Sequence, residues 1–152
     1  MALEFNTIGV QLGYCVEASA GSRPTSGYVK LPNIKSIPAI SLNPSTLEVT
    51  DLTDRYRRYI TGLLDAGDSF EITGNLTASL KTAWASLVAS AASAWTSQKS
   101  TWFEISIPNF DSFYFAGIPT ELGVSELGVD AVVEASLHII PNQIAGWATA
   151  SS

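Results

Sequence analysis

The amino-acid sequence predicts a mainly β protein, a β-sandwich or barrel of mostly antiparallel strands, with one flanking amphipathic α-helix at about residues 77–97. Residues 69–76, 102–107 and 132–140 alternate apolar and polar side chains with a period of two, which is typical of half-buried antiparallel strands. The helical segment instead carries its apolar side chains at the helical period. We expect residues 1–152 to form a single domain, since this length suits one domain.

The N-terminal third is expected to supply edge elements. Residues 5–16 combine β-forming side chains with two glycines and predict an N-terminal strand or arm with a bend. Residues 18–27 are small turn-forming residues and predict a loop, followed by a short strand at 28–31. Three prolines come next, at Pro32, Pro38 and Pro44. Because proline cannot donate to a sheet ladder, we predict an extended edge or arm here, within a long loop at about 32–67.

Residues 45–67 are the most charged part of the chain. Residues 47–49 suit a short strand. The residues after them fit two interpretations, which the sequence leaves open. One is a brief helical turn over 55–60, capped by Thr53 or Asp54, and the other is an ordered loop.

The predicted helix carries one apolar stripe, formed by Leu80, Trp84, Leu87, Val88, Ala91 and Trp95. Both tryptophans of the stripe are therefore expected in the core, and Thr77 is a suitable N-cap. Farther along, residues 113–118 are apolar on both faces, so we expect both faces of that strand to be covered. Trp102 and Trp147 do not fit the inward faces of their segments, which leaves an interface and incidental exposure as alternatives.

Charge is scarce and unevenly distributed along the chain. Charged residues make up 14% of the sequence, against about 25% in ordinary globular proteins. This shortage favours a surface buried against other subunits over a compact monomer with a Ser/Thr-rich surface. All eight Lys and Arg residues lie at or before Lys99, so the net charge of −6 falls in the last third. Such a surface repels nucleic acid and does not bind it by neutralising phosphates.

Recognisable motifs for catalysis, metal binding, secretion and membrane insertion are absent from the sequence. One cysteine, Cys15, forms no internal disulfide and makes no metal site by itself, and we expect it to be a core or edge thiol. The only histidine, His138, falls on the polar face of its segment and is expected at the surface or at an interface. We therefore expect no enzymatic activity, no cofactor and no metal.

Three acidic residues share similar central positions on the polar faces of the alternating segments. They are Glu71, Glu104 and Glu134. If their strands adjoined, two of the carboxylates could approach the separation that glycosidases use, which would make the protein a hydrolase. The alternative, which we favour, is that they are solvated residues of an outer face.

Several short motifs follow one another in a definite order. Residues 31–40 read LPNIKSIPAI, residues 47–54 read LEVTDLTD, residues 58–65 read RYITGLLD and residues 103–109 read FEISIPN. In this order, with the predicted helix between the last two, they resemble the tail tube (major tail) proteins of bacteriophages with long non-contractile tails.

The resemblance implies a structural virion protein, assembled in the cytoplasm of a bacterial host and located in the phage tail. Proteins of this family form hexameric rings that stack into a tube around a tape-measure protein, between a tail terminator and baseplate or initiator proteins. The tube later conducts phage DNA into the host without binding it specifically, and neither a membrane nor a catalytic residue takes part.

The resemblance also suggests roles for two groups of residues. The candidate lumen-facing acids are Glu71, Glu104 and Glu134. The candidate loop between rings or subunits contains Asp51, Asp54, Arg55, Arg57 and Arg58. The alternative is a related neck, tail-terminator or decoration protein, which would form a single ring and stop.

Overall fold

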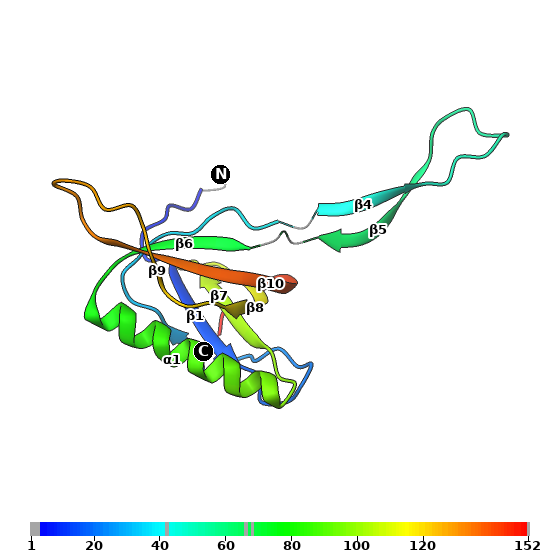
Figure 1. Cartoon of the computed structure of the whole chain (residues 1–152). Coiled ribbons are helices and arrows are strands. Elements are labelled where there is room, and N and C mark those ends of the chain that lie inside the picture. The colour runs from blue at the N-terminus through cyan, green and yellow to red at the C-terminus, as the bar shows by residue number, and fades with distance from the viewer. Residues whose placement is uncertain (1–3, 42, 66, 68, 152) are drawn as a thin grey trace.

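The computed structural model describes residues 4–41, 43–65, 67 and 69–151. It shows a curled, half-barrel β-sheet with a helix packed along it and a long hairpin that projects from the body (Figure 1). The predicted mainly β, antiparallel fold with one helix is confirmed for these residues. Residues 1–3, 42, 66, 68 and 152, some of which fall in the predicted domain ends and long loop, lie outside the described residues.

Eight of the described strands form the main sheet, and all of their pairings are antiparallel. In spatial order the strands are β2 (Val29–Lys30), β1 (Gln11–Val16), β7 (Thr101–Ser106), β8 (Ser112–Pro119), β10 (Glu134–Ala148), β6 (Phe70–Asn75) and β3 (Ile34–Ser36), with β9 (Gly123–Val124) paired to β10. The strands β4 (Asn43–Glu48) and β5 (Tyr59–Asp65) form a separate pair. The edge position of β3 agrees with the extended edge that the prolines predict.

Strand β10 joins the two halves of the sheet. Its first part pairs with β6 and its second part pairs with β8. It begins at Glu134, two residues later than the predicted strand at 132–140, and extends beyond that prediction through Pro141 to Ala148. The register shifts between Pro141 and Gln143, and again between Ile144 and Gly146. A bulge is a place where proline is tolerated in a sheet, and bulges also bend a strand, which fits the curl of the sheet.

The helix α1 (Ala78–Thr96) begins and ends close to the predicted bounds. Thr77 is its N-cap, as predicted, and the hydroxyl of Thr77 accepts a hydrogen bond from the Leu80 N–H at 3.1 Å. The apolar face of α1 packs into the main core with side chains from β1, β6, β7, β8 and β10: Leu12, Phe70, Ile72, Leu80, Trp84, Leu87, Phe103, Phe115, Leu137 and Ile139. Trp95 is 64% exposed, so its predicted place in the core is wrong.

The other face of β7 and β8 is covered as well. Residues 17–28 and the end of the chain lie over it, and Trp102, Tyr114 and Ala116 form a second small core with Tyr28 and Ala148. The Trp102 indole N–H donates a hydrogen bond to Glu17 at 2.8 Å. The prediction that both faces of 113–118 are covered is therefore confirmed, and Trp102 is a core residue.

The first part of the chain differs from its prediction. The strand begins at Gln11 instead of residue 5, because the chain turns at Gly9, whose φ is 84°. Before that turn, the Phe5 ring packs on Phe110 with centroids 4.7 Å apart. Among the described residues, no helix has the length and apolar character needed to cross a membrane.

Candidate assembly surfaces

The hairpin of β4 and β5 extends away from the rest of the molecule (Figure 1). The seven residues of β5 span roughly 20 Å at the rise of an extended chain. Of the two interpretations left open for this segment, the helical turn over 55–60 is excluded and the ordered loop holds up to residue 58, because Val49 and Arg58 are hydrogen-bonded across the hairpin and β5 begins at Tyr59. The predicted long loop at about 32–67 thus contains β3, β4 and β5.

Polar contacts within the hairpin tip (residues 49–58) order it. Asp51 accepts hydrogen bonds from the backbone and hydroxyl of Thr53 at 2.8 and 2.6 Å, and these bonds hold the pKa of Asp51 below its usual value. Asp54 accepts from the Asp51 N–H and from Arg58 Nε, both at 2.9 Å. Two of the five residues predicted for a loop between rings are thus acids that cap the tip itself, and Arg58 is their partner.

The remaining two residues of that prediction, Arg55 and Arg57, form no ion pair within the described part of the chain. The hairpin also leaves its large apolar side chains exposed, namely Leu47, Val49, Leu52, Tyr56, Tyr59, Ile60, Leu63 and Leu64. An isolated two-stranded hairpin has no core of its own and is only marginally stable in water. Exposed apolar side chains gathered in this way are typical of a surface that binds another protein.

Two of the predicted luminal acids lie on one polar face of neighbouring strands. Glu71 of β6 is exposed and lies opposite His138 of β10. Glu134 of β10 forms an ion pair with Lys35, next to β6. The residues that alternate with Glu71 and Glu134, such as Ile72, are buried in the core with α1, so the polar face lies on the side of the sheet away from the helix.

The polar face does not have the geometry of a catalytic site. The Ser136 hydroxyl donates to the Glu71 carboxylate at 2.8 Å and lies 3.1 Å from His138 Nε2. Because the Ser136 hydroxyl donates its proton in a hydrogen bond to the Glu71 carboxylate, the His138 imidazole is not placed to accept that proton as a general base. Glu71 and Glu134 are four ladder positions apart, roughly 13 Å along the strands, which is wider than the spacing of about 5–10 Å in glycosidases.

Glu104, the third predicted acid, is not on an exposed face. Its side chain is 1% exposed. The carboxylate is bound by Lys30 Nζ at 2.8 Å, by the Tyr114 hydroxyl at 2.7 Å, and by the backbone and hydroxyl of Ser151 at 3.0 and 2.9 Å. The expectation that Glu104 is solvated is therefore wrong. The end of the chain covers it, and this placement depends on residues far from it in the sequence.

The environment of Glu104 keeps it charged. Burial by itself would raise the pKa of Glu104, but the hydrogen bonds from Lys30, Ser151 and Tyr114 outweigh burial and lower it to about 2. Burial and the adjacent carboxylate raise the pKa of Tyr114 to about 12, so the phenol stays a donor. The arrangement is a structural ion pair that fastens the end of the chain to the sheet.

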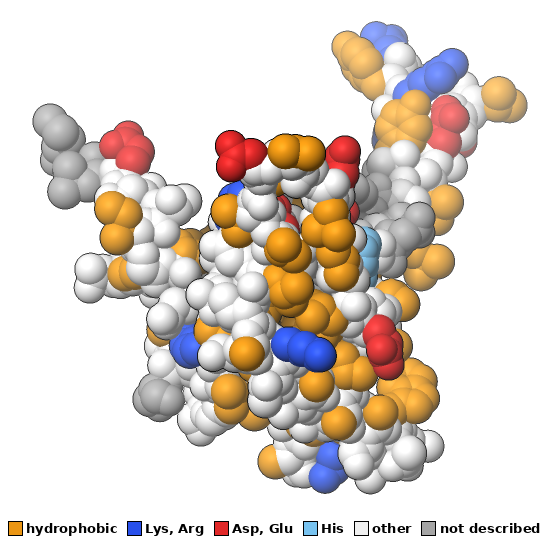
Figure 2. Space-filling model, turned by 60° about the vertical axis from the view of Figure 1, so that its left-hand side comes forward, with side chains coloured by type: hydrophobic (Ala, Val, Ile, Leu, Met, Phe, Trp, Pro, Cys, Tyr) orange, Lys and Arg blue, Asp and Glu red, His pale blue; other side chains and the backbone are white. Residues whose placement is uncertain are grey.

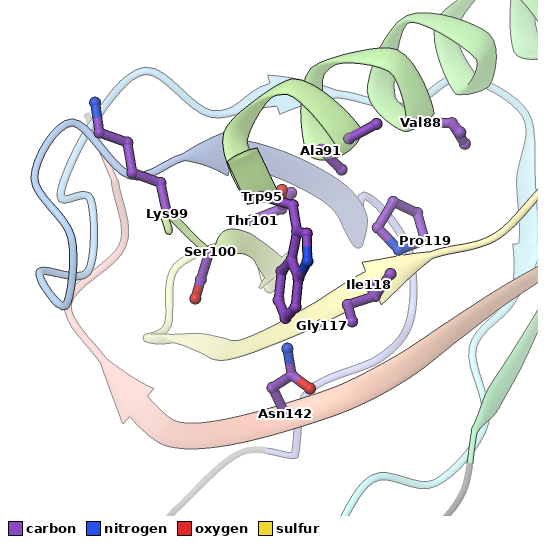
Figure 3. Close-up of a pocket in the computed structure, with 11 residues that line it drawn as sticks. Val88, Ala91, Trp95, Lys99, Ser100, Thr101, Gly117, Ile118, Pro119 and Asn142 are labelled. Carbon is purple, nitrogen blue, oxygen red and sulfur yellow. The ribbon is translucent and has the colours of Figure 1, made fainter. Parts of the chain in front are cut away.

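A groove follows one side of α1. A hollow of about 460 Å³ lies between the end of α1 and β8, and the Trp95 ring extends across it toward Asn142 (Figure 3). A second hollow of about 630 Å³ continues along the helix toward residues 121–124 and shares Val88 and Ala92 with the first. Both hollows are mainly apolar and open to the surface, which suits contact with another protein better than enclosure of a small molecule.

The sequence analysis missed one surface, the loop over residues 125–133 between β9 and β10. Its exposed apolar side chains are Leu127, Val129, Val132 and Val133, and they lie among Glu126 and Asp130. Figure 2 shows acidic and hydrophobic side chains gathered at the top of this face. The sequence patterns did not reveal the loop, because residues 125–131 show no period of two or of 3.6 and the predicted strand at 132–140 included its last two residues.

Comparison with known proteins supports a tail-type fold. No protein-family model and no curated protein matches the sequence. Solved structures of similar fold come from tail and injection-system assemblies, and the likeness extends over nearly the whole chain. The described strands and helix therefore form the fold of subunits in such assemblies.

Three of these structures differ in the assembly they belong to. A chain of the sixfold-symmetrised baseplate of the anti-feeding prophage has a TM-score of 0.63 at 8% identity, covering 96% of this chain and 97% of that one. A chain in the C6-symmetric tail of an empty gene transfer agent particle has a TM-score of 0.60 at 15% identity, covering 95% and 100%. A chain of an extracellular contractile injection system, from its extended sheath–tube complex, has a TM-score of 0.58 at 9% identity, covering 97% and 95%.

Proposed function

We propose that this chain is a structural, non-enzymatic tail protein whose copies form hexameric rings that stack into a phage tail tube. The observation that carries the proposal is a tail-type fold with a projecting hairpin whose apolar side chains are exposed among the described residues. Sixfold symmetry in the tail and baseplate structures of similar fold supports the ring. The hairpin is the arm that joins one subunit or ring to the next.

The polar face of β6 and β10 is the proposed lumen wall. It lies away from the helix and its side chains are hydrophilic, with Glu71 exposed upon it. An acidic wall repels the phosphates of DNA, so DNA passes through without being held. In this function the partners are further copies, a tape-measure protein, a tail terminator and baseplate or initiator proteins. The protein is assembled in the bacterial cytoplasm and becomes part of the virion tail.

A second candidate is a subunit that forms one ring and stops, such as a neck, terminator or decoration protein. Structural similarity supports this second candidate, because the chain resembles a baseplate subunit over as much of its length as it resembles a tail subunit. The two candidates differ in whether rings stack.

Negative-stain electron microscopy of the purified chain at high concentration, together with its mass in solution, tests the proposal. The matched variant replaces residues 49–58 by Asn-Gly, a two-residue turn that suits the Glu48–Tyr59 pair at the end of the hairpin. We expect stacked rings from the wild-type chain and separate rings or single subunits from the variant. Single rings from both chains would favour the second candidate, and wild-type assemblies without rings would contradict both.

A further inference from the structure

Two surfaces at opposite ends of the molecule have complementary chemistry. The hairpin tip, residues 49–58, lies at one end of the view in Figure 1, and the loop over 125–133 lies at the other. Within the part of the chain that the structure describes, neither is covered, and both expose large apolar side chains. In a monomer the apolar side chains of both projections stay exposed to water, whereas an assembly can bury them.

The charges of the two surfaces are opposite. In the tip, Arg58 is neutralised by Asp54, while Arg55 and Arg57 have no ion-pair partner within the described residues. In the loop, Glu126 and Asp130 have no ion-pair partner there either. Opposite charges on two surfaces of one chain attract in one relative orientation and repel in the like-with-like orientations.

The apolar side chains match in the same way. Leu52 and Tyr56 project from the tip beside the unpaired arginines, and Leu127 and Val129 project from the loop beside the unpaired acids. Burying an apolar side chain stabilises a contact more than an exposed ion pair does, because water screens the exposed charges. Apolar contact therefore supplies most of the affinity, and the charges select the partner surface.

We infer that the hairpin tip of one copy docks on the 125–133 loop of another copy of this chain. The inference rests on the proposed function, because it names the surface that receives the proposed arm. The contact joins two different surfaces, so two copies joined by one such contact still offer one free tip and one free loop. Such a head-to-tail contact propagates and does not close after a dimer, as growth of a tube requires.

Charge reversal on both surfaces tests the inference in the full chain. The tip variant is Arg55→Glu with Arg57→Glu, and the loop variant is Glu126→Lys with Asp130→Lys. Each variant alone places like charges at the contact, so we expect the concentration needed for assembly, measured by sedimentation, to rise at least tenfold. Mixed in equal amounts, the two variants restore opposite charges at every contact, and we expect them to co-sediment near the wild-type concentration.

The control carries the same change of charge elsewhere. Glu4→Lys with Asp111→Lys reverses two exposed acids outside both surfaces and outside the helix groove, and is expected to assemble like the wild-type chain. Rings and tubes that form normally from either variant alone, or variants that fail to rescue each other, would overturn the inference and leave the proposed function standing. Mutual rescue in head-to-tail oligomers that never form rings would support the inference and contradict the proposed function.

Discussion

The Tyr114 hydroxyl lies 2.7 Å from Glu104 and donates to its carboxylate inside the covered face of the sheet. The same hydroxyl lies 2.8 Å from the backbone oxygen of Thr149, and the Ser151 N–H donates to the Glu104 carboxylate at 3.0 Å. One carboxylate thus joins β7, β8 and the end of the chain. A buried charge of this kind is stable only while its partners are in place, so its removal has measurable consequences.

Glu104→Gln is expected to lower the free energy of unfolding by about 2 kcal/mol at pH 7, because the charge-assisted hydrogen bonds are lost. The pKa of Glu104 falls from its ordinary 4.5 to about 2 in the folded chain. A lowered pKa means that the charged carboxylate stabilises the fold above about pH 4.5, and that this stability is lost as the pH falls toward 2. The wild-type and variant curves should therefore converge in acid.

Urea denaturation between pH 2 and 7, at a concentration where the chain is unassembled, measures this difference. Glu126→Gln, a change at an exposed acid, serves as the control and should follow the wild-type curve. A Glu104→Gln curve that runs parallel to the wild type over the whole range would show that this carboxylate does not carry the acid-labile stability.

Thr77→Ala is expected to cost about 1 kcal/mol of stability, the usual value of an N-cap. The variant loses the acceptor for the Leu80 N–H and also the donor to the Asn33 side chain at 2.9 Å. Thr77→Ser keeps the hydroxyl and should retain most of the stability. Thermal or urea denaturation compares the three chains, and equal losses from both substitutions would mean that the threonine methyl, not the hydroxyl, is what matters.

Gly117→Ala is expected to destabilise the fold by about 2 kcal/mol, as overpacking of a tight core does. A Cβ at this position would lie 2.6 Å from Ile139 Cγ2 and 2.8 Å from the Ile140 backbone oxygen, at the junction of β8 and β10. Gly128→Ala is the control, since a Cβ there meets nothing within 4 Å. Its effect should stay within about 0.5 kcal/mol. Equal effects at both positions would contradict the close approach of these strands.

The periodicity of apolar side chains in the sequence predicted those strands and the helix that have a buried face within the chain. The period of two located most of β6 and β7, the double apolar face located β8, and the stripe with Thr77 located α1. For the hairpin, the sequence predicted only a short strand at 47–49, which overlaps β4. It did not predict β5, because Leu63 and Leu64 are adjacent and both exposed, so β5 has no buried face to set an alternation. In the proposed function, a partner outside the chain covers the apolar side chains of these strands.

Among the candidate site residues, too, the sequence predicted those positions that depend on neighbouring residues and not those that depend on distant ones. Glu71 could be placed on a polar face from its neighbours alone, because Phe70 and Ile72 fix the alternation. The burial of Glu104 could not, since its cover comes from Lys30 and Ser151, which are distant in the sequence. Alternation tells which side of a sheet a residue occupies, and only the tertiary fold tells what covers that side.

The orientation of the polar face in a tube can be measured by labelling a cysteine placed on it. Glu71→Cys in a Cys15→Ser chain puts the only thiol on the proposed lumen wall, and Ser90→Cys in the same background puts it on the exposed side of α1. Removing Cys15 is a precaution, although burial already raises the pKa of that thiol and slows its reaction.

If the polar face lines the lumen, a maleimide on a large polymer should label the thiol of the Glu71→Cys variant quickly in free subunits and at least tenfold more slowly in assembled tubes. A small maleimide should reach it in both states, because a lumen wide enough for DNA admits small molecules. The Ser90→Cys thiol should react equally fast with both reagents before and after assembly, since α1 lies on the other side of the sheet. Equal labelling of both variants in tubes would place the polar face outside the lumen and would leave stacking itself unaffected.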